Sequence, residues 1–319
     1  MTRRTLATGM LLVALYVGVP LLFGGDLYLM SNIVAALTIA GIALSWALLG
    51  NLGGMVSFGH AAFVGVGAYV SALCVMKLGV PVFAAIALGG IGAAMASILI
   101  APALRLRGPY FALAILAYAH IFKIVATEWK SLTNGSGGLS SIPRFPQWLG
   151  FDFGSKTGSY FIVLSLVLAF AAIYNLVRRS HYGLALRAMH DSEAATRVVG
   201  VNSLLLKGWM LLLSAFMAGV MGAFNAHYIN FLEPDYAFGA PWTTLPIVAA
   251  IFGGYRTIIG PVIGALVVYL VDQLIFKSLI PSGHQVILGA LLIGMILWSP
   301  GGMLPPLTRF FNRRAHAEA

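Results

Sequence analysis

The feature that most constrains this chain is a succession of long apolar segments, each close to the length that crosses a lipid bilayer. A transmembrane helix needs about 20 consecutive, mainly apolar residues. Because these runs are continuous rather than alternating apolar and polar, they favour a bundle of helices over a β-barrel. We predict about ten spans, at residues 5–23, 31–49, 57–76, 81–101, 109–127, 159–177, 208–226, 242–255, 260–276 and 284–299. The eighth is short, and it either crosses the membrane fully or re-enters on the same side.

The composition supports a membrane protein. Hydrophobic residues make up 60% of the 319 residues and charged residues only 9%, against about 25% charged residues in soluble domains. The net charge of +10 comes from loops between spans, and no basic patch with interleaved aromatic residues indicates a nucleic-acid partner. The sequence therefore predicts one all-α, polytopic membrane domain over 1–319, with the lipid bilayer around it and no nucleic acid bound.

The distribution of Lys and Arg predicts the orientation. If the amino terminus is cytosolic and all ten spans cross, thirteen of the 19 basic residues face the cytosol and five face outward. An excess of Lys and Arg on the cytoplasmic side is the usual orientation signal. We therefore expect both termini in the cytoplasm, an outer loop at 128–158 and a cytosolic loop at 178–207.

The loop at 178–207 is the only long polar segment that carries dense positive charge. It predicts two short helices, 183–189 and 192–199, with Asp191 as the N-cap of the second and Gly200 just after its end. A capped, charged helical element between two spans can be contacted only by a soluble protein, so we interpret it as a docking surface.

Two segments rich in glycine and proline interrupt the apolar pattern, GNLGGMVSFG at 50–59 and a second at 239–260. Backbone polar groups exposed by such breaks are tolerated at membrane depth only where protein buries them or a wet cavity meets them. In transporters, paired breaks point to the substrate pathway. The candidate pathway residues, for which helix packing is the alternative role, are Ser57, Gly59, His60 and Tyr110.

Small residues also recur at every fourth position in several spans. Such stripes let helix backbones approach closely in lipid. We expect them to mark tightly packed helix pairs, and one stripe consists of Ser214, Ala218, Gly222 and Ala226.

No catalytic constellation and no metal-ligand spacing is visible, so we expect a protein that is not an enzyme and holds no metal. A proton-coupled carrier usually shows a relay of acids or histidines within its spans, and an ion channel a charged ring or a carbonyl filter. Neither pattern is present in the sequence. Energy for uphill transport would then enter through the loop at 178–207.

Five motifs carry a resemblance to a known family. They are, in order, GNLGGMVSFGHAAFVGVGAY at 50–69, RLRGPYFALAIL at 105–116, TNGSGGL at 133–139, GLALRAMHDSEAATRVVGVN at 183–202 and IFGGYRTIIGPVIGA at 251–265. Together they resemble the permease subunits of branched-chain amino acid ABC transporters, of the LivM type.

The resemblance implies a cobalamin-type (type II) importer architecture in the bacterial inner membrane. It implies four kinds of partner contact: a second homologous permease subunit, two cytosolic ATP-binding subunits, a periplasmic solute-binding protein and lipid. ATP and Mg would be bound by the partners, since the chain has no Walker A motif and needs no cofactor of its own. The residues that the family would use for ATPase coupling are Gly183, Arg187, Asp191, Glu193, Ala194, Ala195 and Gly200.

The expected substrates are leucine, isoleucine and valine, with urea, short amides or aromatic acids as alternatives within the same family. A stand-alone secondary carrier or channel, and a membrane enzyme or scaffold, are the competing interpretations. The coupling loop favours the ABC permease over both.

The orientation can be tested by thiol labelling. In a Cys74→Ala background, a cysteine at Ser140 should react with an impermeant reagent from outside the cell, and one at Ser192 should not. Reversed labelling would overturn the orientation, and the docking interpretation with it.

Overall fold

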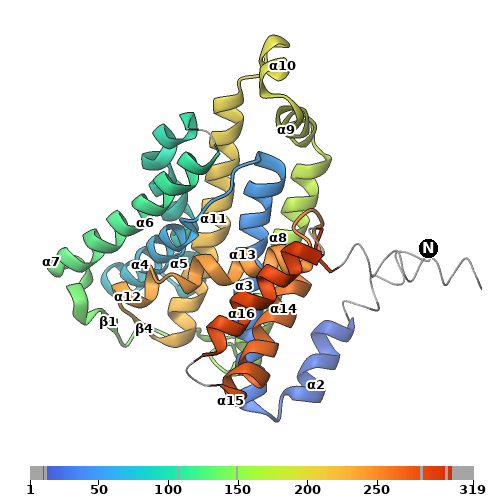
Figure 1. Ribbon diagram of the computed structural model, residues 1–319. Helices are drawn as coiled ribbons and strands as arrows, with labels where there is room; N and C mark the ends of the chain where they lie inside the picture. Colours follow the sequence, from blue (N-terminus) through green and yellow to red (C-terminus); the bar gives the residue numbers. More distant parts are fainter. Residues whose placement is uncertain are drawn as a thin grey trace, which may run out of the picture.

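The computed structural model describes residues 10, 13–106, 108–148, 150–280, 283–298 and 301–303. It is mostly helical, which confirms the predicted helical fold (Figure 1). Within the described residues, 8 helices are long and apolar enough to cross a membrane, at Leu27–Leu52, His60–Leu78, Val82–Arg105, Pro109–Glu128, Lys156–Arg179, Ser203–Ile229, Pro234–Gly253 and Gly260–Leu279.

In the part of the chain that the structure describes, the secondary structure is a series of helices with four short strands. The helices of the first half are η1 (Ala14–Gly18), α2 (Val19–Phe23), α3 (Leu27–Ala47), η2 (Leu48–Leu52), α4 (His60–Leu78), α5 (Val82–Ile100), η3 (Ala101–Arg105), α6 (Pro109–Glu128), α7 (Lys130–Thr133) and η4 (Gly135–Gly137). Those of the second half are α8 (Lys156–Arg179), α9 (His181–Asp191), α10 (Glu193–Val198), α11 (Ser203–Ile229), α12 (Pro234–Ala237), α13 (Pro241–Gly253), α14 (Gly260–Val271), η5 (Asp272–Phe276), α15 (Lys277–Leu279) and α16 (His284–Trp298). The strands are β1 (Leu139–Ser140), β2 (Gln147–Trp148), β3 (Phe151–Asp152) and β4 (Phe231–Leu232).

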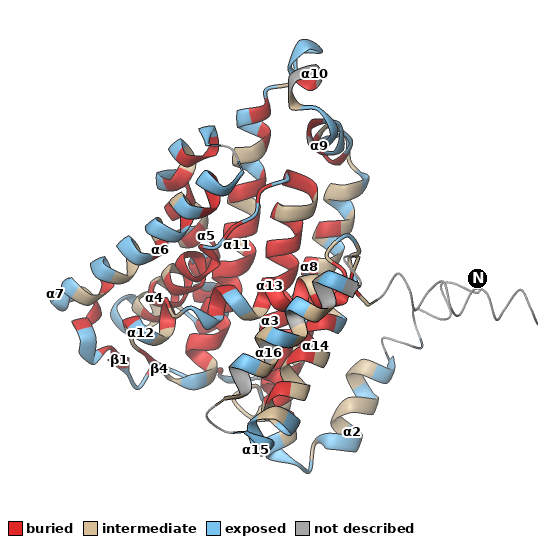
Figure 2. Ribbon diagram, in the orientation of Figure 1, coloured by how far each residue is buried: buried red, intermediate tan, exposed pale blue. Residues whose placement is uncertain are grey.

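Two helices, α3 and α11, form the buried centre of the bundle (Figure 2). Helix α11 packs against α4 and α5 on one side, and α3 packs against α8, α13 and α14 on the other. Large side chains such as Met30, Ile42, Phe63 and Phe224 are fully buried in this core. The interior therefore lies along two long helices that run between the two ends of the molecule.

Glycines bring α11 into direct backbone contact with its neighbours. A Cβ atom on Gly222 would overlap the carbonyl oxygen of Val64 in α4, and one on Gly67 would overlap that of Gly219. A Cβ atom on Gly89 in α5 would likewise crowd the carbonyl of Gly67. The stripe of small residues predicted along α11 is thus confirmed as a packing seam for Gly222.

Helix α11 is longer than the span 208–226 predicted from hydropathy. It begins after Asn202, whose side-chain oxygen accepts a hydrogen bond from the Leu205 N–H at 3.1 Å. It ends at Asn230, which adopts a left-handed backbone with φ 66°. The caps extend the helix beyond its apolar core, because capping residues and not hydropathy end a helix.

The predicted first, eighth and last spans differ most from full-length helices. The first, 5–23, lies partly outside the described residues, and its described part is the short apolar segment Ala14–Phe23. The eighth lies within Pro234–Gly253, which joins the short helix α12 to α13 and, at 20 residues, counts among the candidate spans. The described part of the tenth is α16, 15 residues long, which at 1.5 Å per residue is shorter than a hydrocarbon core of about 30 Å, so the count of ten stays a prediction.

The segment predicted as an outer loop, 128–158, is folded against the lower end of α11 in Figure 1. Strand β1 pairs with β4 in antiparallel register, Leu139 opposite Leu232, and β2 pairs with β3. The Asn230 amide donates to the Ile142 carbonyl at 3.1 Å, and the Arg144 Nε donates to the Asn230 Oδ1 at 2.7 Å. These bonds fix the segment to the end of the central helix.

The backbone contact between α4 and α11 makes a direct prediction. Gly222→Val should destabilise the protein by more than about 2 kcal/mol, since overpacking usually costs about 1–3 kcal/mol and here the obstacle is backbone. The measurement is the melting temperature of the purified protein in detergent. Gly289→Val is the matched control, because a Cβ at that position in α16 would meet nothing within 4 Å. Equal melting temperatures for the two variants would contradict the tight backbone contact at Gly222.

Candidate coupling and pathway site

The corner between α8 and α9 is held by contacts of Ser180, Gly183 and Arg187. The Ser180 hydroxyl accepts a hydrogen bond from the Gly183 N–H at 3.3 Å and so caps α9. A Cβ on Gly183 would overlap the carbonyl oxygens at the end of α8. The Arg187 guanidinium donates to the Arg178 carbonyl at 2.7 Å. Gly183 and Arg187 together hold α9 at a fixed angle to α8.

An ion-pair cluster joins α10 to α11. The Glu193 carboxylate pairs with the Arg197 guanidinium at 2.6 Å and with the Lys207 ammonium at 3.1 Å. Burial alone would raise the pKa of Glu193, but Lys207, Ser203 and Arg197 outweigh it and lower the pKa to about 2. Glu193 is therefore ionised throughout the physiological pH range, and the link between the two helices persists across it.

The junction of α9 and α10 corrects one prediction. Asp191 is not the N-cap of the second helix but the last residue of α9. Ser192 breaks the helix with an extended backbone, φ −156° and ψ 102°, because Ser serves at that boundary as well as Asp does. Glu193, Ala194 and Ala195 form the first turn of α10.

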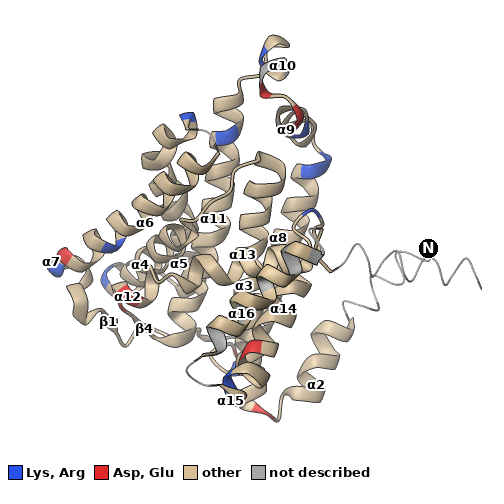
Figure 3. Ribbon diagram, in the orientation of Figure 1, with Lys and Arg blue, Asp and Glu red and all other residues tan. Residues whose placement is uncertain are grey.

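The end of α10 is as predicted, because Gly200 has φ +87°, the left-handed conformation that glycine adopts most readily after a helix. Beside it, the α9–α10 segment presents large apolar side chains to the outside, namely Tyr182, Leu184, Val198 and Val199. Lys and Arg gather around the same end of the bundle (Figure 3). An exposed apolar patch with a charged surround is typical of a protein interaction site.

The glycine break at 50–59 contains an extended stretch with two faces. Met55 and Ser57 are buried, whereas Val56 and Phe58 are exposed. The Trp46 indole N–H donates to the Ser57 carbonyl at 2.9 Å, and the Met55 N–H donates to the Leu49 carbonyl at 3.3 Å. Backbone groups that the broken helix would have paired are thus satisfied by α3 and η2.

His60 lies at the end of this stretch and is completely buried. Its Nδ1 is 3.0 Å from the Ser57 hydroxyl and its Nε2 is 3.1 Å from the Ser214 hydroxyl, which itself donates to the Ser45 carbonyl. Ser214 lies 11 residues along α11, roughly 16 Å from the start of that helix, about half the thickness of a hydrocarbon core. The imidazole therefore ties α4 to α11 at membrane depth.

The four candidate pathway residues do not form one surface. Ser57 and His60 point into the bundle, and Gly59 lies against the Ile115 carbonyl of α6, which a Cβ atom would overlap. Tyr110, in the first turn of α6, is 71% exposed. These positions favour packing for Gly59 and His60, the alternative role that the sequence left open.

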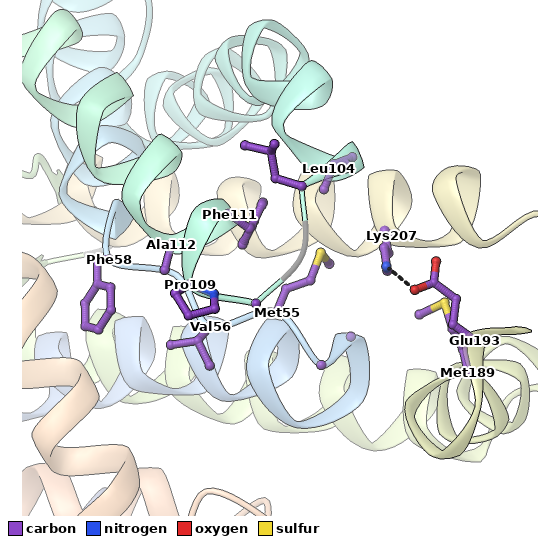
Figure 4. A pocket seen from close by; sticks show the side chains of 14 residues that line it. Met55, Val56, Phe58, Leu104, Pro109, Phe111, Ala112, Met189, Glu193 and Lys207 are labelled. Atoms are coloured by element: carbon purple, nitrogen blue, oxygen red, sulfur yellow. Dashed lines mark ion pairs between the residues drawn. The ribbon is translucent and has the colours of Figure 1, made fainter.

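A cavity of about 590 Å³ lies beside the break instead (Figure 4). It connects the glycine break to α9 and α10, and its lining side chains come from Met55, Val56, Phe58, Leu104, Leu106, Pro109, Phe111, Ala112, Met189, Glu193 and Lys207. Sequence reasoning missed Val56 and Phe58. Met55, Val56 and Phe58 are all apolar, so nothing in the sequence separates the exposed Val56 and Phe58 from the buried Met55.

A bundle of apolar helices of membrane-spanning length, with a broken segment and a projecting charged element, is the architecture of a polytopic helical membrane protein. A family model described as "Branched-chain amino acid transport system / permease component" matches residues 6–296, and the chain belongs to this family.

Among its relatives is the high-affinity branched-chain amino acid transport system permease protein LivM of Salmonella typhimurium, 27% identical over 280 residues, which cover 80% of this chain and 65% of LivM. The Escherichia coli LivM is 28% identical over 89% of this chain and 73% of its own length. LivH of Salmonella typhimurium, also a permease protein by name, is 27% identical over 84% of this chain and 91% of its own length. The chain thus spans just under two thirds of the Salmonella LivM. No solved structure matches it.

The buried imidazole makes a testable prediction. Ser214→Ala removes the partner of the His60 Nε2 and should lower stability by about 1–3 kcal/mol, the usual cost of a buried unsatisfied polar atom. Ser278→Ala removes an exposed hydroxyl that bonds only within its own helix and should change stability by less than about 0.5 kcal/mol. Thermal melting of both variants in detergent checks this, and an unchanged melting temperature for Ser214→Ala would show that the hydrogen bond between His60 and Ser214 does not stabilise the protein.

Proposed function

We propose that this chain is a transmembrane permease subunit of an ATP-driven ABC importer that moves branched-chain amino acids across the membrane. The observation that carries the proposal is the family match over residues 6–296. The names of the LivM and LivH relatives support leucine, isoleucine and valine as the substrate class.

In this proposal the α9–α10 segment docks on a cytosolic ATP-binding subunit. Its exposed apolar side chains supply the contact, and the corner at Gly183 and the ion pairs of Glu193 transmit movement to α8 and α11. A partner can shift the permease between two conformations only if it contacts them differently. Because the α9–α10 segment is joined firmly to α8 and α11, a movement of these helices changes its position and therefore its contact with the partner.

The complete transporter would contain a second homologous permease subunit, two ATP-binding subunits that hold ATP and Mg, and a periplasmic solute-binding protein. The excess of Lys and Arg at the α9–α10 end supports a bacterial inner-membrane protein with both termini in the cytoplasm. A type II arrangement of ten spans is the architecture we propose for it.

The function is tested by reconstitution. The chain, co-expressed with its partner subunits, is placed in proteoliposomes, and uptake of labelled leucine is measured with the binding protein and ATP. Leucine uptake that requires ATP supports the proposal. Transport of urea, a short amide or an aromatic acid in place of leucine would overturn the substrate, and uptake without ATP would overturn the class.

The α9–α10 segment, which we call the coupling segment, gives a testable prediction about leucine uptake. Glu193→Lys replaces an attraction to Arg197 and Lys207 by repulsion, and Gly183→Val opens the corner at α8. Both variants should reach the membrane, retain ATP hydrolysis and lose leucine uptake by at least about tenfold, the effect of roughly 1.4 kcal/mol. Glu128→Lys and Gly289→Val, at the far end of α6 and in α16, are matched controls. Normal leucine uptake by both Glu193→Lys and Gly183→Val would show that the α9–α10 segment does not couple ATP hydrolysis to transport.

A further inference from the structure

The cavity beside the glycine break combines apolar walls with one pair of opposite charges. Among its described lining residues, only Glu193 and Lys207 are charged, and they lie together at one end (Figure 4). Met55, Leu104 and Met189 line the walls nearby, and Val56 and Phe58 lie toward the other end. Its volume of about 590 Å³ falls within the range of about 300–1,000 Å³ that small-molecule sites occupy.

The two charges are mostly withdrawn from water. The side chain of Lys207 is 15% exposed and that of Glu193 is 25% exposed. Partial burial strengthens the interaction of each with an opposite charge, and a charge left without a counter-charge there would be costly. Glu193 keeps Arg197 as a partner, so a ligand that enters between Glu193 and Lys207 must bring a negative group for Lys207. A positive group close to it restores the second partner of Glu193.

An α-amino acid has that arrangement, because its ammonium and carboxylate are attached to the same carbon atom. The ammonium would replace Lys207 as the partner of Glu193, and the carboxylate would replace Glu193 as the partner of Lys207. One ion pair is thereby exchanged for two, with no change in net charge. An aliphatic side chain would then contact the apolar walls, where burial of each methylene is favourable.

We propose that this cavity is a binding site for an aliphatic α-amino acid at the coupling-segment end of the permease. The proposal rests on the proposed function, since it places the transported product beside the ion pair that joins α10 to α11. A bound amino acid separates Glu193 from Lys207 and loosens that joint. Product accumulating on this side therefore acts on the coupling segment and slows further import.

Binding is measured by calorimetry on the full chain in nanodiscs, with whatever subunits co-purify but without binding protein or ATP. The probes are leucine, 4-methylpentanoate, 3-methylbutylamine, glycine and urea. Leucine should bind. The acid and the amine each lack one charge and should bind at least about tenfold more weakly, since a hydrogen bond to a charged group contributes that much. Glycine, which lacks the aliphatic side chain, should be weaker by a similar factor.

Two variants test the location. Val56→Trp fills the cavity from an exposed position and should abolish leucine binding without disturbing the core. Lys207→Met removes the partner of the carboxylate and should weaken leucine at least about tenfold. Ile121→Trp, on the exposed face of α6, and Lys130→Met, in α7, are matched controls and should bind leucine normally. If Lys207→Met does not fold, Val56→Trp decides the question.

The outcomes separate this site from the transport function. Leucine uptake by the complete transporter together with no leucine binding here would overturn the site and leave the function standing. Equal binding of 4-methylpentanoate and leucine would show a carboxylate site only, and unchanged binding by Val56→Trp would place the ligand elsewhere; either result overturns the proposal. Binding of urea but not leucine would overturn the site and the proposed substrate together.

Discussion

Lipid gives helices no hydrophobic reason to associate, so this bundle depends on how closely the backbone of α11 approaches α4 and α5. The contact works because Gly67, Gly219 and Gly222 have no side chains to separate the helices. Once it is made, the position of α11 beside α4 and α5 is set at Gly219 and Gly222. It then carries Lys207 to the coupling segment, Ser214 to His60 and Asn230 to the segment at 128–158.

The same closeness makes the glycine break tolerable. An extended backbone inside a membrane protein needs hydrogen-bond partners from the protein itself. Trp46 of α3 supplies one to the Ser57 carbonyl, and the Thr243 hydroxyl accepts another from the Ala61 N–H. His60 completes the arrangement through Ser57 and Ser214. The break is therefore held rigidly on its inner face, and its outer face, with Val56 and Phe58, borders the cavity.

Much of this fold could be predicted from local pattern. Apolar runs place most of the long helices, the stripe through Gly222 predicts the tightest contact, and Gly200 predicts the end of α10. These signals work because each depends on neighbouring residues. The partner of His60 could not be predicted, since Ser214 is 154 residues away. The Asp191 cap failed because Asp and Ser are equally good caps, so sequence alone does not fix which of two adjacent residues breaks the helix.

The candidate site shows a further limit of sequence. The polar residues of the break attract attention as pathway candidates, yet Ser57 and His60 face the protein interior. In a membrane protein a polar side chain is satisfied by other helices rather than by water, so polarity does not indicate which face is open. The run at 54–58 shows no alternation of polarity, and only the packing places Met55 and Ser57 inside and Val56 and Phe58 outside.

The tight contact of α11 with α4 and α5 also makes α11 a lever. The helix runs through 27 residues, roughly 40 Å, and at Gly219 and Gly222 its backbone lies in close contact with α5 and α4. From Gly219 back to Lys207 the distance is about 18 Å, and from Gly222 to the last residue of the helix, Ile229, it is about 10 Å, at 1.5 Å per residue. Any tilt about that fulcrum moves the two ends in opposite directions, and the coupling end travels about twice as far as the other.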